Sequence, residues 1–289
     1  MRGLILSSFS VLCVLVFSVA LFFSDNLLMF WLFLELATLG LIPSFFLHLE
    51  SGVLGSLFSY IIVSGVSSSL VICGLLFDEF LLLTVVGFLI KFGLFPFLGW
   101  VYVVVLSSNW LVVWGLSTFL KSAFLFFSFF LSGGWDLWIV ELCCVFTFLV
   151  IALLFWVCTT SWLYYWCHVM ISSSAALVVM AVELSVDVLF WLFLVYILWA
   201  TLVIWLLSYF EGFEVGGAMF YFLCVFILVS FPGSLAIFYK LVIGFSVYSC
   251  GLLVFSSWVV YNISEQFYLV KYLVSSGVPR SEWSGSVMV

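Results

Sequence analysis

Long runs of hydrophobic residues, separated by very short polar stretches, fill most of this chain. Each run has about 20 residues or more, the length a helix needs to cross a hydrocarbon core about 30 Å thick. The runs lack the alternation of apolar and polar residues that strands of a membrane barrel show. The pattern therefore predicts an all-α, polytopic transmembrane bundle. The expected spans, about ten in number, are 4–23, 27–49, 53–77, 80–106, 109–131, 137–157, 163–183, 186–208, 217–246 and 250–272.

The spans follow one another without a soluble insertion, so residues 1–272 are expected to form a single transmembrane domain, with 273–289 as a short polar tail. An even number of spans places both termini on one side of the membrane. Arg2, Lys271 and Arg280 then share that side, as the positive-inside rule favours. Arg2 and the apolar run after it also fit a signal peptide, but equally apolar sequence follows, so an uncleaved first span is expected.

Composition supports a membrane protein and excludes several other classes. Hydrophobic residues make up 68% of the chain and charged residues 7%, against about 45–50% and about 25% in soluble domains. A soluble enzyme and a disordered chain are thereby excluded. The net charge of −7 is scattered, without a basic stripe for nucleic acid. The eight cysteines form no C-x-x-C pair and are expected to be buried hydrophobes.

Four charged residues lie inside apolar runs: Glu35, Lys91, Lys121 and Lys240. A lysine at the bilayer centre costs at least about 2.5–3.5 kcal/mol, so it must face the bundle interior, water or a partner. Three such lysines together indicate a path that carries charge. Two simpler interpretations stay open: Lys240 reaches a nearby span end closed by Gly244, and Glu35 serves only as a structural ion-pair partner.

Two other polar residues lie nearer the ends of their predicted spans. His168 and Glu141 are expected to be anchors at the membrane interface rather than members of a charge path. Glu35 is then the only carboxylate assigned to a deep position. This assignment argues against a stand-alone cation/proton antiporter, which would use a deep carboxylate pair to coordinate its cation.

Two predicted spans contain helix breakers close to a lysine. Pro96, flanked by Gly93 and Gly99, follows Lys91, and the pair Pro232-Gly233 precedes Lys240. Proline removes a backbone donor and clashes with the preceding turn. Broken helices at membrane depth are tolerated where they are buried in protein or line a water-filled cavity. The sequence therefore predicts two broken helices beside the charge path.

Several of these segments resemble subunit 2 of the NADH–ubiquinone oxidoreductases (respiratory complex I). Trp31–Glu35, followed by an Ile-Pro pair, is similar to the family's W-x-x-L-E…I-P segment. Lys91–Trp100 is similar to its K-x-G-x-x-P-F-H-x-W segment. Lys121, Ser172–Ser174 and Ser230–Lys240 lie where the family has a second buried lysine, a Ser-Ser pair and a G-L-P-P…K segment. The order and spacing agree over about residues 20–245, and the composition and length are similar to those of mitochondrial members from flatworms.

The chain also departs from the family pattern. The family's histidine before the tryptophan is absent around Leu98-Gly99, and its asparagine after the glutamate is Ala37. Its Pro-Pro is Pro232-Gly233, and only His168 is available in place of its basic pair before the serines. From the resemblance we also expect this chain to lack a final span that longer relatives carry after the tenth.

The resemblance implies a membrane-arm subunit of respiratory complex I in the mitochondrial inner membrane, with an antiporter-like fold of two pseudo-symmetric helix sets. It implies no cofactor in this chain, with FMN and the iron–sulfur clusters in partner subunits. Its partners would be other membrane-arm subunits and lipid, with ubiquinone involved only indirectly and no nucleic acid. The implied activity couples ubiquinone reduction by NADH to proton translocation.

The family's pattern also suggests a relay in which Glu35 partners Lys91, Lys121 passes the proton along the midplane, and Lys240 leads to the exit. An ion pair at about 4 Å gains about 4 kcal/mol at an effective dielectric near 20. Moving one charge against 100 mV costs about 2.3 kcal/mol. Forming or breaking such an ion pair therefore involves enough energy to move one proton against this potential. Alternatives are the stand-alone antiporter and a structural subunit whose lysines are inert contacts.

Overall fold

The computed structural model describes residues 2–24, 26–47, 52–76, 81–125, 128, 138–212 and 218–277. Every regular element in these ranges is helical, which confirms the all-α class. The predicted tail from 278 onward, with Arg280, lies outside the described residues. In chain order the elements are α1 (Arg2–Phe22), α2 (Leu27–Leu41), η1 (Ile42–Leu47), α3 (Val53–Leu76), α4 (Leu81–Phe92), α5 (Gly99–Leu106), α6 (Trp110–Ser117), η3 (Phe119–Phe124), α8 (Trp138–Val157), α9 (Trp162–Glu183), α10 (Val186–Gly212), α11 (Ala218–Leu228), α12 (Leu235–Ser249) and α13 (Leu252–Gly277).

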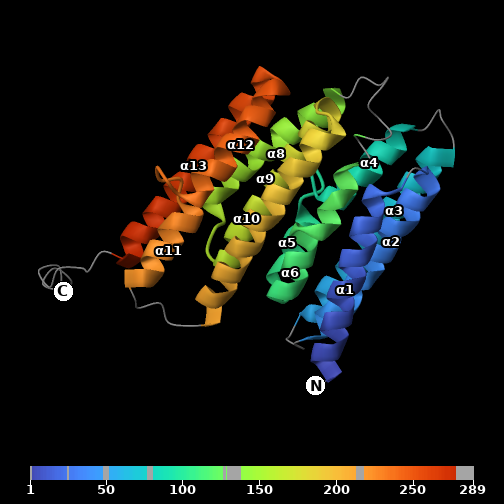
Figure 1. The fold of residues 1–289 in the computed structure, drawn as a ribbon, viewed down its shortest axis with the longest axis horizontal. Helices are drawn as coiled ribbons and strands as arrows, with labels where there is room; N and C mark the ends of the chain where they lie inside the picture. The colour runs from blue at the N-terminus through green and yellow to red at the C-terminus, as the bar shows by residue number, and fades with distance from the viewer. Residues whose placement is uncertain are drawn as a thin grey trace, which may run out of the picture.

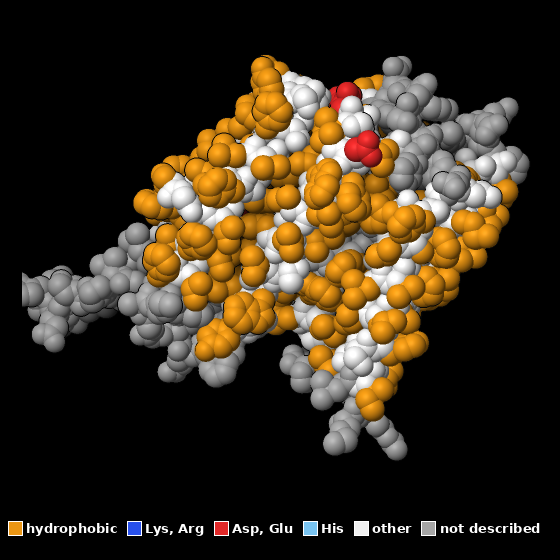
Figure 2. Space-filling view, in the orientation of Figure 1, with side chains coloured by type: hydrophobic (Ala, Val, Ile, Leu, Met, Phe, Trp, Pro, Cys, Tyr) orange, Lys and Arg blue, Asp and Glu red, His pale blue; other side chains and the backbone are white. Residues whose placement is uncertain are grey.

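The helices lie side by side with similar inclination, α1 to α3 on one side and α11 to α13 on the other (Figure 1). Six stretches within the described ranges are long and apolar enough to cross a membrane: α1, α2 with η1, α3, α8, α9 and α10. Three predicted spans consist of shorter helices, and the last forms α13. The total of about ten crossings therefore stays a prediction. Hydrophobic side chains cover most of the face in Figure 2, as expected for a surface in contact with lipid.

Helix α9 is the centre of the bundle. Within its span 94% of the residues are buried, and it contacts α4, α5, α8, α10, α12 and η3. Its sequence explains this position, because Ser172–Ala176 is a run of small residues. Small residues let helix backbones approach closely, which is how helices pack in a membrane. The central helix therefore presents a polar serine run to the elements around it.

The break predicted at Pro96 is confirmed, because α4 ends at Phe92 and α5 begins at Gly99. Gly93 adopts φ +64°, a left-handed conformation that favours glycine. A Cβ there would also lie 2.3 Å from Val101 Cγ2. The Phe95 backbone N–H donates to Thr147 Oγ1 on α8 at 3.0 Å, so this donor is satisfied despite the break.

The second predicted break, at Pro232-Gly233, separates α11 from α12 and is also confirmed. Gly233 has φ +90°. The backbone N–H of Ser230 donates to Gln266 Oε1 on α13 at 2.9 Å. In both breaks, a side chain from another helix therefore accepts a backbone donor that lies outside the regular helices.

Two details differ from the sequence-based expectation. The predicted span 109–131 is interrupted at Thr118, where α6 gives way to the 3-10 helix η3. Gly244 closes no span, because α12 continues through it to Ser249, and the turn lies at Gly251 (φ +135°). A Cβ at Gly244 would meet the Trp258 ring at 2.9 Å, so this glycine permits close packing of α12 on α13.

Candidate functional site

Glu35 and Lys91 form an ion pair between α2 and the last turn of α4. Lys91 Nζ lies 3.0 Å from Glu35 Oε1, with 11% of the lysine side chain and 20% of the glutamate side chain exposed. Each charge compensates the other where water is scarce, as buried charges require. Lys91 lies in the last turn of α4, two residues before Gly93, so the ion pair lies next to the break. The structure thus brings together two of the four residues singled out from the sequence.

Lys121 lies in η3, and the residue is 3% exposed. Its ammonium donates to the Met170 carbonyl at 2.7 Å, to Ser173 Oγ at 2.5 Å and to the Tyr196 hydroxyl at 2.8 Å. A lysine ammonium has three N–H donors, so each has an acceptor. Within the described ranges this lysine forms no salt bridge. Its buried charge is therefore supported by neutral oxygens, and also by the Tyr196 ring, whose centroid is 4.7 Å from Nζ.

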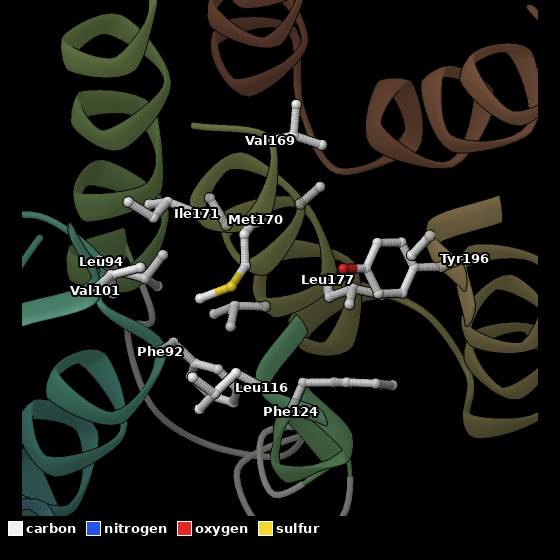
Figure 3. Close-up of a cluster of buried hydrophobic side chains, with 14 of the residues drawn as sticks. Phe92, Leu94, Val101, Leu116, Phe124, Val169, Met170, Ile171, Leu177 and Tyr196 are labelled. Atoms are coloured by element: carbon white, nitrogen blue, oxygen red, sulfur yellow. The ribbon is translucent and has the colours of Figure 1, made fainter. Parts of the chain in front are cut away.

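The interruption of the helix at Thr118 helps to position Tyr196, one of the three acceptors of Lys121. It leaves the Ser117 carbonyl at the end of α6 free to accept a hydrogen bond from the Tyr196 hydroxyl. Tyr196 extends from α10 with its hydroxyl pointing toward α9 (Figure 3). This hydroxyl donates its proton to the Ser117 carbonyl and accepts a hydrogen bond from Lys121. No sequence pattern singles out Tyr196, because tyrosines are common along the apolar runs.

Lys240 pairs with a carboxylate that the sequence analysis missed. Lys240 Nζ on α12 lies 2.7 Å from Glu265 Oε2 on α13, and only 2% of the Glu265 side chain is exposed. The alternative in which Lys240 reaches a span end closed by Gly244 is therefore wrong. The assignment of Glu35 as the only deep carboxylate is also wrong. The missed signal was a charged residue near the middle of the predicted span 250–272.

His168 is buried rather than placed as an exposed anchor. Its Nδ1 lies 2.7 Å from the Tyr102 hydroxyl and its Nε2 lies 3.1 Å from Thr159 Oγ1. The ring is fully buried, so the expected interfacial exposure is wrong. It contacts none of the three buried lysines. Glu141 remains half-exposed in the first turn of α8, as its position near a span end predicted.

Two small cavities lie beside the three lysines. The first, of about 40 Å³, is lined by both Lys91 and Lys121. The second, of about 20 Å³, is lined by Ser173, Lys240 and Glu265. Ser173, which lines the second cavity, accepts a hydrogen bond from Lys121, which lines the first, so this one hydrogen bond connects the walls of the two cavities. Each exceeds the roughly 10–15 Å³ that one water molecule needs, and each has lysine, serine and tyrosine side chains in a largely apolar wall.

No group of three or more His, Cys, Asp or Glu side chains that could hold a metal ion occurs in the described ranges. The cysteines whose side chains are described are free thiols. Where the redox groups lie stays a prediction.

No protein-family model matches the chain, and no curated protein matches it. A chain in a solved structure of respiratory complex I from Thermus thermophilus with bound aureothin has a similar fold. The TM-score is 0.74 at 17% sequence identity, and the match covers 94% of this chain and 71% of that chain. The bundle therefore has the fold of a respiratory complex I chain.

Proposed function

We propose that this chain is a membrane-arm subunit of NADH:ubiquinone oxidoreductase, most similar to subunit 2, in the mitochondrial inner membrane. The shared fold supports the class of complex, and the resemblance of the segments around Glu35, Lys91 and Lys240 supports the subunit. Its partners are other membrane-arm subunits and lipid, and it meets ubiquinone only indirectly. FMN and the iron–sulfur clusters belong to partner subunits.

In this proposal Glu35, Lys91, Lys121 and Lys240 form a proton relay. The observation that carries it is that the three lysines line two cavities large enough for water, whose walls are connected by the Lys121–Ser173 hydrogen bond. Lys91 shares the first cavity with Lys121, and Ser173 connects Lys121 to the cavity that Lys240 lines. Water in each cavity would bridge gaps that are too long for direct transfer.

The energy for loading and unloading a lysine comes from its changing partner. Withdrawing a carboxylate from an ammonium at about 4 Å removes about 4 kcal/mol at an effective dielectric near 20. The Glu35–Lys91 pair has this kind of geometry, at 3.0 Å. Movement of Glu35 therefore favours or disfavours the charged form of Lys91 by more than the about 2.3 kcal/mol needed against 100 mV.

A stand-alone cation/proton antiporter is the second candidate, and Glu265 strengthens it by adding a deep carboxylate. Each deep carboxylate is, however, bound to a lysine ammonium, which occupies the place that a transported cation would take. Blue-native electrophoresis of mitochondrial membranes separates the two functions. We expect a tagged chain in a large band that oxidises NADH. A tagged chain that migrates alone and exchanges Na⁺ or K⁺ for protons would contradict the proposal.

The relay itself is tested by Lys121→Met in the assembled complex reconstituted into vesicles. Methionine fills the lysine's space without a proton to transfer, so we expect proton translocation to be abolished. The matched control is Lys271→Met, which removes an exposed lysine at the far end of α13. Intact proton translocation with Lys121→Met would refute the role of Lys121. A structural subunit with inert lysines predicts that outcome.

A further inference from the structure

We propose that Glu265 is an additional member of the relay, inserted between Lys121 and Lys240, and that it controls when Lys240 releases its proton. This inference rests on the proposed relay. Its starting point is the close contact of Lys240 Nζ and Glu265 Oε2 at 2.7 Å, formed between α12 and α13. The second broken helix thus carries a Lys–Glu pair as the first one does.

Both oxygens of Glu265 are engaged inside the protein. Oε2 accepts from Lys240, and Oε1 accepts from the Tyr165 hydroxyl on α9 at 3.1 Å. The residue is almost fully buried. Any proton that reaches this carboxylate must therefore come through the bundle.

The second cavity supplies that route. Ser172 and Ser173 form one part of its wall, and Lys240 and Glu265 form another. Tyr261 also lines the cavity and lies between the Ser172 and Glu265 side chains, close enough to interact with both. Ser173, which binds Lys121, therefore lines the same cavity as the Tyr261 hydroxyl and the Glu265 carboxylate.

Lys240 also borders a groove that Glu265 does not reach. It lines a largely apolar groove of about 1170 Å³ between α12 and α13, which Glu265 does not line. Two polar atoms of groove-lining residues, Ser230 Oγ and Gln266 Nε2, have no hydrogen-bond partner in the described structure. Within this pair, Glu265 therefore lines only the second cavity, whereas Lys240 lines both the second cavity and the groove.

This placement defines a balanced exchange. A proton arriving through the second cavity binds Glu265 and converts the carboxylate to a carboxylic acid. The acid no longer stabilises the Lys240 ammonium, which transfers its proton to a water molecule on the groove side, leaving an amine and a hydronium ion. The O–H bond of Glu265 then breaks as its proton moves to the Lys240 nitrogen. The original carboxylate–ammonium pair is restored, with one proton taken up and one released.

The test uses the assembled complex in vesicles, with NADH–ubiquinone electron transfer and proton translocation measured together. Glu265→Gln cannot take up the proton, so we expect translocation to slow by about a hundredfold, as on loss of a positioned proton-transfer group. Glu265→Asp keeps a carboxyl group and should recover part of the rate. Glu183→Gln is the control, because this exposed glutamate at the end of α9 lies outside the cavities.

A double variant separates a relay role from a structural one. Lys240→Met combined with Glu265→Gln leaves no unpaired charge, so it should assemble even if Glu265→Gln alone does not. A purely structural pair predicts that translocation returns in the double variant, and that result would overturn the inference. Normal translocation with Glu265→Gln would overturn it too. If Lys121→Met still translocates protons normally, the proposed relay fails as well; if only the Glu265 variants translocate normally, this inference fails alone.

Discussion

The ammonium of Lys121 donates a hydrogen bond to the Ser173 hydroxyl over 2.5 Å, joining η3 to the central helix α9. The same hydroxyl donates back to carbonyls of its own helix, including that of Met170. Ser173 therefore supports a buried charge on one side and lines the second cavity on the other. No other residue in the described ranges lines that cavity and also hydrogen-bonds Lys121.

Replacing Ser173 by alanine should weaken both the fold and the relay. The change leaves one Lys121 N–H without an acceptor, which costs about 1–3 kcal/mol for a buried donor and more for a charged one. We expect a lower thermal midpoint of the solubilised complex and slower proton translocation. Ser56→Ala is the control, because this buried serine bonds only to Val53 in its own helix. Equal effects of the two variants would contradict a specific role for Ser173.

Gly93→Ala should destabilise the protein by distorting the first break. Alanine at φ +64° costs roughly 1–2 kcal/mol, and its Cβ would lie 2.3 Å from Val101 Cγ2. We expect a clear fall in the thermal midpoint and in the amount of assembled complex.

The control for that variant is Gly55→Ala. Gly55 lies inside α3 with nothing within 4 Å of an added Cβ, and alanine favours a helix over glycine by up to about 1 kcal/mol. The midpoint should therefore stay the same or rise. If both glycine variants behaved alike, the tight geometry around Gly93 would not be the cause.

The sequence predicted those parts of the site that follow from local rules. Lysines in apolar runs must be compensated wherever they fall, and Pro-Gly signals break helices whatever surrounds them. Lys91, Lys240 and both proline breaks could therefore be found before the fold was known. That Glu35 partners Lys91 followed from the resemblance rather than from the residues themselves.

The residues that were missed depend on packing between distant helices. Glu265 and Tyr196 owe their roles to helices α13 and α10 lying against α12 and η3, which spacing along the chain does not reveal. The interruption at Thr118 has no proline or glycine beside it to announce it. His168 was misplaced because distance from a span end says little about burial when the helix itself is central. The geometry of the pairs and the interruption at Thr118 required the three-dimensional structure, whereas the two proline breaks did not.

Exchanging the charges of Glu35 and Lys91 should separate stability from proton transfer. In the double variant Glu35→Lys/Lys91→Glu, an ion pair can still form between α2 and α4, so assembly should be retained. The ammonium would, however, start from position 35, which does not line the first cavity, whereas Lys91 does. We therefore expect an assembled complex with little proton translocation.

The single variant Glu35→Lys provides the comparison for this exchange. It would place two ammonium groups together, with repulsion of about 4 kcal/mol at about 4 Å and an effective dielectric near 20. Less assembled complex should result, and restoring the opposite charge at position 91 should recover it. Blue-native electrophoresis reports assembly, and a pH-sensitive dye in vesicles reports translocation. Normal translocation by the exchanged pair would show that the cavity beside Lys91 is not the path that protons take.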